Sequence, residues 1–144
     1  MSRTGPGTRS IGFLLNHASR AVMQEHRAAL RLLGLDEDMW IMIQNIRSGG
    51  ELGAEPVESA DRVHVSRGSL VGAAERLVRA GWAQPAPERP TEAGYLVLTK
   101  KALDALPGLD SNATWLIERA TSGFTHEEVE ALGGYLARII ENMA

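Results

Sequence analysis

Residues 65–82, VSRGSLVGAAERLVRAGW, contain a short helix whose two ends are both marked in the sequence. Ser66 is a favourable N-cap because its hydroxyl accepts a hydrogen bond from a first-turn amide, and Gly81 suits the left-handed position that ends many helices. One apolar stripe with helical spacing lies between them: Leu70, Ala73, Ala74, Leu77 and Val78. Arg67 and Ser69 lie off this stripe, where they could reach phosphates and base edges in a DNA major groove. Taken alone, the pattern is more typical of a surface helix with solvated arginines.

A second short helix is predicted directly before the first. Pro56 suits the first position of a helix, where its missing amide would have no partner in any case. The apolar face of this helix follows at helical spacing: Val57, Ala60 and Val63. A turn through His64 joins the two helices, and this arrangement is the outline of a helix-turn-helix.

The segment after Gly81 predicts a small β-ribbon. Residues 82–84 and 95–98 can pair as antiparallel strands, and the prolines and glycine between them exclude a helix there. A ribbon beside a helix-turn-helix is a wing. The predicted fold is therefore mainly α with a small β-wing.

Longer helices are predicted on both sides of this unit. Residues 10–34 form a first helix that ends at Gly34, with a stripe wide enough to contact more than one element: Ile11, Leu14, Leu15, Ala18, Ala21, Val22, Ala28, Ala29, Leu32 and Leu33. Asp36 caps a second helix whose Trp40 points to the core. After the wing, residues 99–121 are helical with a kink or break at Pro107.

The last helix opens with a capping box formed by Thr125 and Glu128. Its apolar stripe consists of Val129, Leu132, Leu136, Ile139, Ile140 and Met143. Residues 1–9 contain Gly5, Pro6 and Gly7 and are expected to be a flexible arm.

Composition narrows the function. The chain has 144 residues, of which 44% are hydrophobic and 23% charged, and this fits one soluble domain. Its formal net charge of −3 argues against indiscriminate nucleic-acid binding but leaves room for a basic patch. The absence of cysteine excludes disulfides and thiolate nucleophiles, and four scattered histidines predict no metal site. We expect no cofactor.

No apolar run is long enough to span a bilayer, and no signal segment is evident, so a cytoplasmic location is expected. No motif such as GxSxG brings a serine and a histidine together, so we do not expect an enzyme.

The order of these elements and four local strings resemble the MarR family, the winged-helix regulators named for multiple antibiotic resistance. The strings are GLDEDMW at 34–40, similar to the family's GLTPPQW; VSRGSL at 65–70, continued by Arg76-Leu77 and AGW at 80–82; Leu98-Thr99; and FTHEE at 124–128, similar to LSPEE. The resemblance runs from Ile11 to Met143.

This resemblance implies a homodimer built by residues 10–34 and 99–144, with residues 36–98 as the winged helix-turn-helix. It further implies a sequence-specific DNA-binding regulator, commonly a repressor, that acts on a pseudo-palindromic operator and is released in many members by a small ligand. Carried over position by position, it assigns groove or phosphate contacts to Ser66, Arg67, Ser69, Val71, Arg62, Arg76 and Arg89.

The chain departs from the family in its wing and its recognition helix. Residues 85–95 carry Arg89 as their only basic side chain, beside two glutamates, and Gly72 stands where an arginine is common. Weaker and less salt-sensitive DNA binding than the family norm is therefore expected. The alternative is a winged-helix dimer with weak or lost DNA binding that acts through protein contacts.

Four further residues lie on elements that line the effector cavity in the family: His17, Arg20, Trp40 and Trp115. An aromatic or histidine side chain on an apolar helix face is more often a packed core residue than a ligand contact. The four residues are therefore candidates for an effector site only by this resemblance.

Overall fold

The computed structural model describes residues 8–87 and 94–144, apart from the side chains of Thr8 and Arg9. Its elements, in chain order, are α1 (Thr8–Arg31), α2 (Glu37–Ser48), the 3-10 turn η1 (Gly50–Leu52), α3 (Pro56–Val63), α4 (Arg67–Arg79), β1 (Ala83–Pro85), β2 (Leu96–Leu98), α5 (Lys100–Ala120) and α6 (His126–Met143). The predicted fold class, mainly α with a small antiparallel wing, is confirmed.

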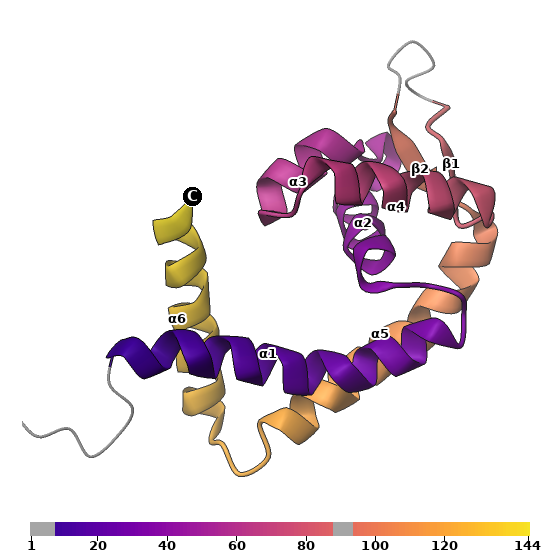
Figure 1. Cartoon of the computed structure of the whole chain (residues 1–144). Coiled ribbons are helices and arrows are strands. Elements are labelled where there is room, and N and C mark those ends of the chain that lie inside the picture. Colours follow the sequence, from indigo (N-terminus) through magenta and orange to yellow (C-terminus); the bar gives the residue numbers. More distant parts are fainter. Residues whose placement is uncertain (1–7, 88–93) are drawn as a thin grey trace, which may run out of the picture.

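The elements separate into a lobe and a set of terminal helices (Figure 1). The lobe consists of α2, α3, α4 and the two strands. The terminal helices are α1, α5 and α6; α1 and α5 lie side by side beneath the lobe, and α6 projects from the far end of α5. Within residues 8–87 and 94–144, no helix has the length and apolar character needed to cross a membrane.

The core lies where α2 and α4 pack together under the wing. Its fully buried side chains include Ile43 and Ile46 of α2 and Leu70 and Leu77 of α4. Leu106 of α5 closes the same cluster from below. Burial of each such aliphatic side chain contributes about 1.5–3 kcal/mol relative to exposure, so the lobe has a dense apolar centre.

The wing is a two-stranded antiparallel ribbon. Ala83 pairs with Leu98 and Pro85 with Leu96, while the backbone of Leu96 also exchanges two hydrogen bonds with Ala54, of 2.8 and 3.1 Å. Pro85 is tolerated because β1 is an edge strand. Gly53, with φ of 72°, is required at the close approach to β2, since an added Cβ would lie 1.9 Å from the carbonyl oxygen of Leu96.

Of the kink or break expected at Pro107, the break is wrong. A single helix, α5, runs from Lys100 to Ala120 through this proline. Pro107 and Gly108 both face solvent, while Leu106 and Leu109 on either side of them are buried. The carbonyl left without a donor therefore belongs to an exposed turn, where water can satisfy it, and the packed face holds the helix together.

The stripe predicted for the first helix needs correction at its end. Leu32 is 88% exposed, whereas Leu30 and His26, one turn apart, are buried. Helix α1 ends at Arg31, and Gly34, with φ of 74°, lies in the turn that follows. The face that contacts α2 and α5 thus ends at Leu30. The flexible arm predicted over residues 1–9 falls largely outside the described residues, and α1 already begins at Thr8.

Candidate nucleic-acid interface

A tight left-handed turn joins α3 to α4. His64 adopts φ 58° and ψ 40°, and the Val65 amide donates to the carbonyl of Ala60 at 3.1 Å. Ser66 then caps α4: its Oγ accepts from the Ser69 amide at 3.1 Å and donates to Ser69 Oγ at 2.9 Å. The sequence places a histidine at the position where glycine is easiest to accommodate, and the turn forms nonetheless.

The tip of α4 is open to solvent. Ser66 and Arg67 are exposed, and the Arg67 side chain retains 66% of its accessible surface. On the opposite side of the helix, Leu70, Ala73 and Leu77 are fully buried, as their spacing predicted. Val78 is the exception in that stripe, since it is 42% exposed. Packing therefore fixes which face of α4 is presented.

Arg67 forms a two-pronged ion pair with Asp61 in the last turn of α3. Its Nε donates to Oδ1 at 2.9 Å and its Nη2 to Oδ2 at 2.8 Å. The hydrogen bonds from Arg67 hold the pKa of Asp61 below its ordinary value, and Asp61 in turn raises the pKa of Arg67. The pair is thus fully ionised near neutral pH.

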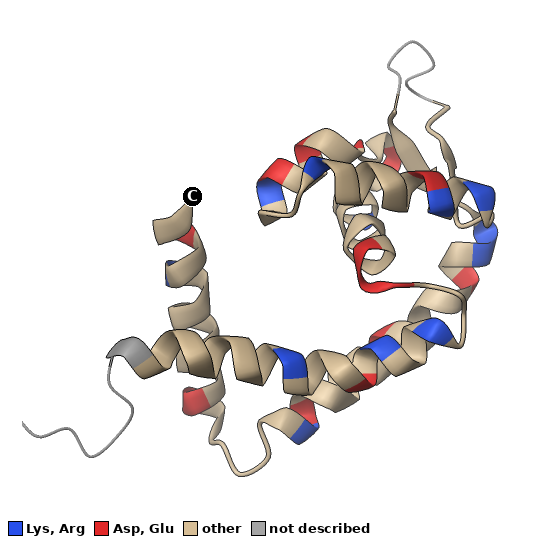
Figure 2. Cartoon of the chain, in the orientation of Figure 1, with Lys and Arg blue, Asp and Glu red and all other residues tan. Residues whose placement is uncertain are grey.

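Two other arginines that were assigned to DNA already have partners in the lobe. Arg76 pairs with Asp36 at 3.0 Å, and the same carboxylate caps α2 by accepting from the Met39 amide at 2.9 Å. Arg62 donates to the side-chain oxygen of Asn45 at 3.2 Å. Figure 2 accordingly shows acidic and basic residues mixed along α3 and α4 rather than a continuous basic stripe.

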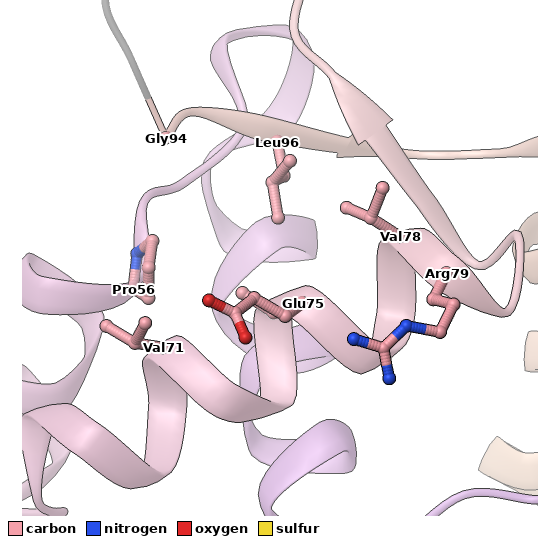
Figure 3. A pocket seen from close by; sticks show the side chains of 8 residues that line it. Pro56, Val71, Glu75, Val78, Arg79, Gly94 and Leu96 are labelled. Carbon is pink, nitrogen blue, oxygen red and sulfur yellow. The ribbon is translucent and has the colours of Figure 1, made fainter.

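Val71 and Ser69 are half-buried. Val71 lines an open, mainly apolar hollow of about 530 Å³ between α4, the start of α3 and β2. Figure 3 shows its side chain next to Pro56, with Glu75 and Arg79 further along the same helix. A groove contact by Ser69 or Val71 stays a prediction, and Arg89 lies outside the described residues.

The four candidate ligand residues are distributed over three helices. His17 and Arg20 are exposed on α1, where His17 meets the ring of Phe13 edge-on. Trp115 of α5 is 52% exposed and lies under the guanidinium of Arg119. In the described part of the chain, no hydrogen bond, ion pair or ring contact links any two of the four. Their role as a ligand site stays a prediction.

His26 of α1 was missed by the sequence reasoning. It is 4% exposed, meets the ring of Trp40 edge-on at 5.1 Å, and neither ring nitrogen has a hydrogen-bond partner among the described residues. Burial lowers the pKa of His26, and the nearby carboxylate of Glu37 partly offsets this. His26 lies four residues from both Val22 and Leu30, so the sequence already indicated that it shares their apolar face of the helix.

Within residues 8–87 and 94–144, no group of three or more histidines and carboxylates is placed to hold a metal ion. The arrangement is that of a winged helix-turn-helix lobe joined to long terminal helices.

Comparison with known proteins sharpens this class. No family model and no curated sequence matches the chain. Solved structures do. A MarR protein from Peptoclostridium difficile superposes with a TM-score of 0.82 at 22% identity, over 99% of this chain and 92% of that one. A MarR transcriptional regulator from Methanosarcina mazei superposes with a TM-score of 0.82 at 18% sequence identity, over 96% of this chain and 92% of that one. A MarR-family transcriptional regulator from a Rhodococcus species superposes with a TM-score of 0.79 at 17% sequence identity, over 95% of this chain and 96% of that one.

The chain therefore has the fold of the MarR transcriptional regulators along essentially its whole length. These structures confirm the fold that the four sequence strings implied.

Proposed function

We propose that this protein is a MarR-type transcription regulator that binds double-stranded DNA through α4 as a homodimer. One observation carries the proposal. The start of α4, capped by Ser66, faces solvent, while the opposite face of the same helix is buried in the core of the winged lobe. The structural neighbours from Rhodococcus and Methanosarcina mazei are named as transcriptional regulators, and this supports the same class. A protein of this class acts by binding and not by catalysis.

The dimer is proposed from the terminal helices. Helix α6 contains no buried residue within one chain, although Leu132, Leu136 and Ile139 lie along one side of it and are each 39% exposed. On α1, Phe13 is 66% exposed and Ile11 45%. Apolar surface of this extent on long helices is a feature of protein interfaces, and two-fold symmetry is the commonest way to cover it.

Two-fold pairing would present two copies of α4 to successive turns of the major groove, about 34 Å apart, so the target is a pseudo-palindrome. We propose repression as the mode of action and release by a small ligand as its control, as the family resemblance implies. A reporter under the chain's own upstream region, with and without the regulator, tests the direction of control.

The direct test is fluorescence anisotropy on the DNA upstream of the gene. Arg67→Ala is expected to weaken binding by about 30-fold or more, because one base or phosphate contact is lost in each of two half-sites and each loss costs about 1–3 kcal/mol. Arg31→Ala on α1 removes the same charge away from α4 and serves as the control. Equal binding by the wild type and Arg67→Ala would refute recognition through this helix.

The salt dependence gives a second readout. Since Arg67 and Arg76 are paired with carboxylates of the chain, fewer phosphates are neutralised and a shallow slope of affinity against salt is expected. A slope that corresponds to about ten phosphate contacts would contradict this expectation.

A second function is favoured by those same ion pairs and the net charge of −3. In this alternative the winged-helix dimer binds DNA weakly or not at all and acts through protein contacts. Absence of binding to any duplex at low salt, together with a dimer in sedimentation, would support it.

A further inference from the structure

The ion pair between Arg67 and Asp61 uses one side of the guanidinium and leaves another free. The two bonds to Asp61 come from Nε and from one N–H of Nη2. A guanidinium carries five N–H groups in a fixed plane, so three remain, two on Nη1 and one on Nη2. No described residue accepts from Nη1 of Arg67. The free edge therefore presents two parallel donors.

This free edge is accessible. The side chains of Arg67 and Asp61 retain 66% and 53% of their surface, and they lie on either side of the turn that joins α3 to α4. The two anchoring bonds fix the plane of the guanidinium, which an unpaired arginine would leave free to rotate. The orientation of the free edge is thus set by Asp61 before any partner arrives.

Stability does not account for such a pair. Exposed ion pairs contribute between nothing and about 1 kcal/mol to folding, and the turn is already closed by the Ser66 cap and the backbone bond from Val65 to Ala60. The paired guanidinium of Arg67 is instead suited to donate hydrogen bonds to an uncharged acceptor, such as a base edge. Since Asp61 cancels the charge of Arg67, attraction to phosphate is reduced, while the two free donors keep the geometry that matches O6 and N7 of guanine.

We propose that Asp61 is a specificity-determining residue, which positions Arg67 to donate two hydrogen bonds to one guanine in each half-site. This inference rests on the proposed function. It adds that guanine is the recognised base and that Asp61 determines this preference. Asp61 acts through Arg67 and is a positioning residue.

The experiment selects binding sites from a random duplex library with the full-length protein and then measures affinity for the selected site with the guanine replaced. The wild type is expected to select guanine at one pair of symmetric positions and to prefer it by about tenfold or more. Arg67→Lys keeps the charge but loses the planar fork, so it should lose this preference.

Asp61→Asn is the decisive variant. It is expected to reduce the guanine preference to about threefold or less while raising affinity for random duplex, because one negative charge near the DNA is removed. Asp61→Glu keeps that charge but displaces the fork, so it should reduce the preference without the gain on random DNA. Asp104→Asn is the matched control, since Asp104 is ion-paired with Lys100 at 2.7 Å on α5 and its loss should leave the preference unchanged.

The outcomes are distinct. A guanine preference that is equal in the wild type, Asp61→Asn and Asp61→Glu would overturn the positioning role, as would wild-type binding with no base preference at all. Thermal unfolding by circular dichroism identifies any variant that fails to fold, and the remaining Asp61 variant then decides. If no protein in the series binds DNA, the proposed function itself fails, and this inference fails with it.

Discussion

The lobe and the terminal helices use the same residue types in opposite ways. In the lobe, Ile43 and Ile46 of α2 and Leu70 and Leu77 of α4 are almost completely buried within one chain. In α6, the stripe of leucine and isoleucine leaves 39–59% of each side chain exposed. The lobe is therefore complete in one copy, whereas the terminal helices have an apolar face with nothing from their own chain to cover it. Under the proposed function, the lobe would present α4 to DNA and the terminal helices would form the contact with a second subunit.

The largest expected effect contrasts a leucine from each region. Leu77→Ala empties a fully buried position in the lobe and should lower the free energy of unfolding by about 2–5 kcal/mol at every protein concentration. Leu136→Ala, at a 39% exposed position of α6, should cost little when dilution separates the subunits and more when they associate. Urea unfolding at two protein concentrations measures both. If Leu136→Ala lowered the free energy of unfolding equally at both protein concentrations, the stripe on α6 would not be part of an interface between subunits.

A smaller effect is expected at the helix caps. Ser66→Ala and Thr125→Ala each remove a hydroxyl that accepts from an amide at 3.1 Å, at a cost of about 1 kcal/mol. The loss of Ser66 should appear in the unfolding of the lobe. The loss of Thr125 should instead appear as a raised dissociation constant of the dimer in sedimentation equilibrium. If both caps affected only the lobe, α6 would not contribute to the interface.

The smallest effect concerns His26, at the contact between the two regions. Because burial lowers its pKa in the folded chain, the unfolded chain binds a proton first as the pH falls. The free energy of unfolding should therefore decrease as the pH falls below about 6.5, the ordinary value for histidine. His26→Leu should remove this component, which urea unfolding at pH 7 and pH 5 detects. Identical pH dependence in the wild type and the variant would contradict the assignment.

What could be predicted from the sequence was mostly local. The caps at Asp36, Ser66 and Thr125 and the proline at the start of α3 act within four residues of themselves, and all four were predicted correctly. The wing followed from prolines between two short apolar runs. These features need no knowledge of what lies across the fold.

The features that were missed depend on distant neighbours. A break at Pro107 was allowed for, beside a kink, because the exposure of this proline on α5 could not be known. His26 was overlooked because the side of α1 that faces α2 is set by the turn at Gly34. The pairing of Arg67 with Asp61 requires the left-handed conformation of His64, which brings together side chains six residues apart. The exposure of Ser66 and Arg67 at the start of α4 could therefore be predicted, while the carboxylate that pairs with Arg67 could not.

The unbroken length of α5 has a mechanical consequence. At about 1.5 Å per residue its 21 residues span about 31 Å, and its first turn is bonded to the end of α4 through Thr99 and Lys101, which donate to the carbonyls of Gly81 and Ala80. A helix of this kind behaves as a lever arm. A tilt of about 5° at Ala120 would carry Lys100, and with it the base of the wing, through about 3 Å. A change in packing at the Ala120 end of α5 would thus move the end of α4 and the base of the wing.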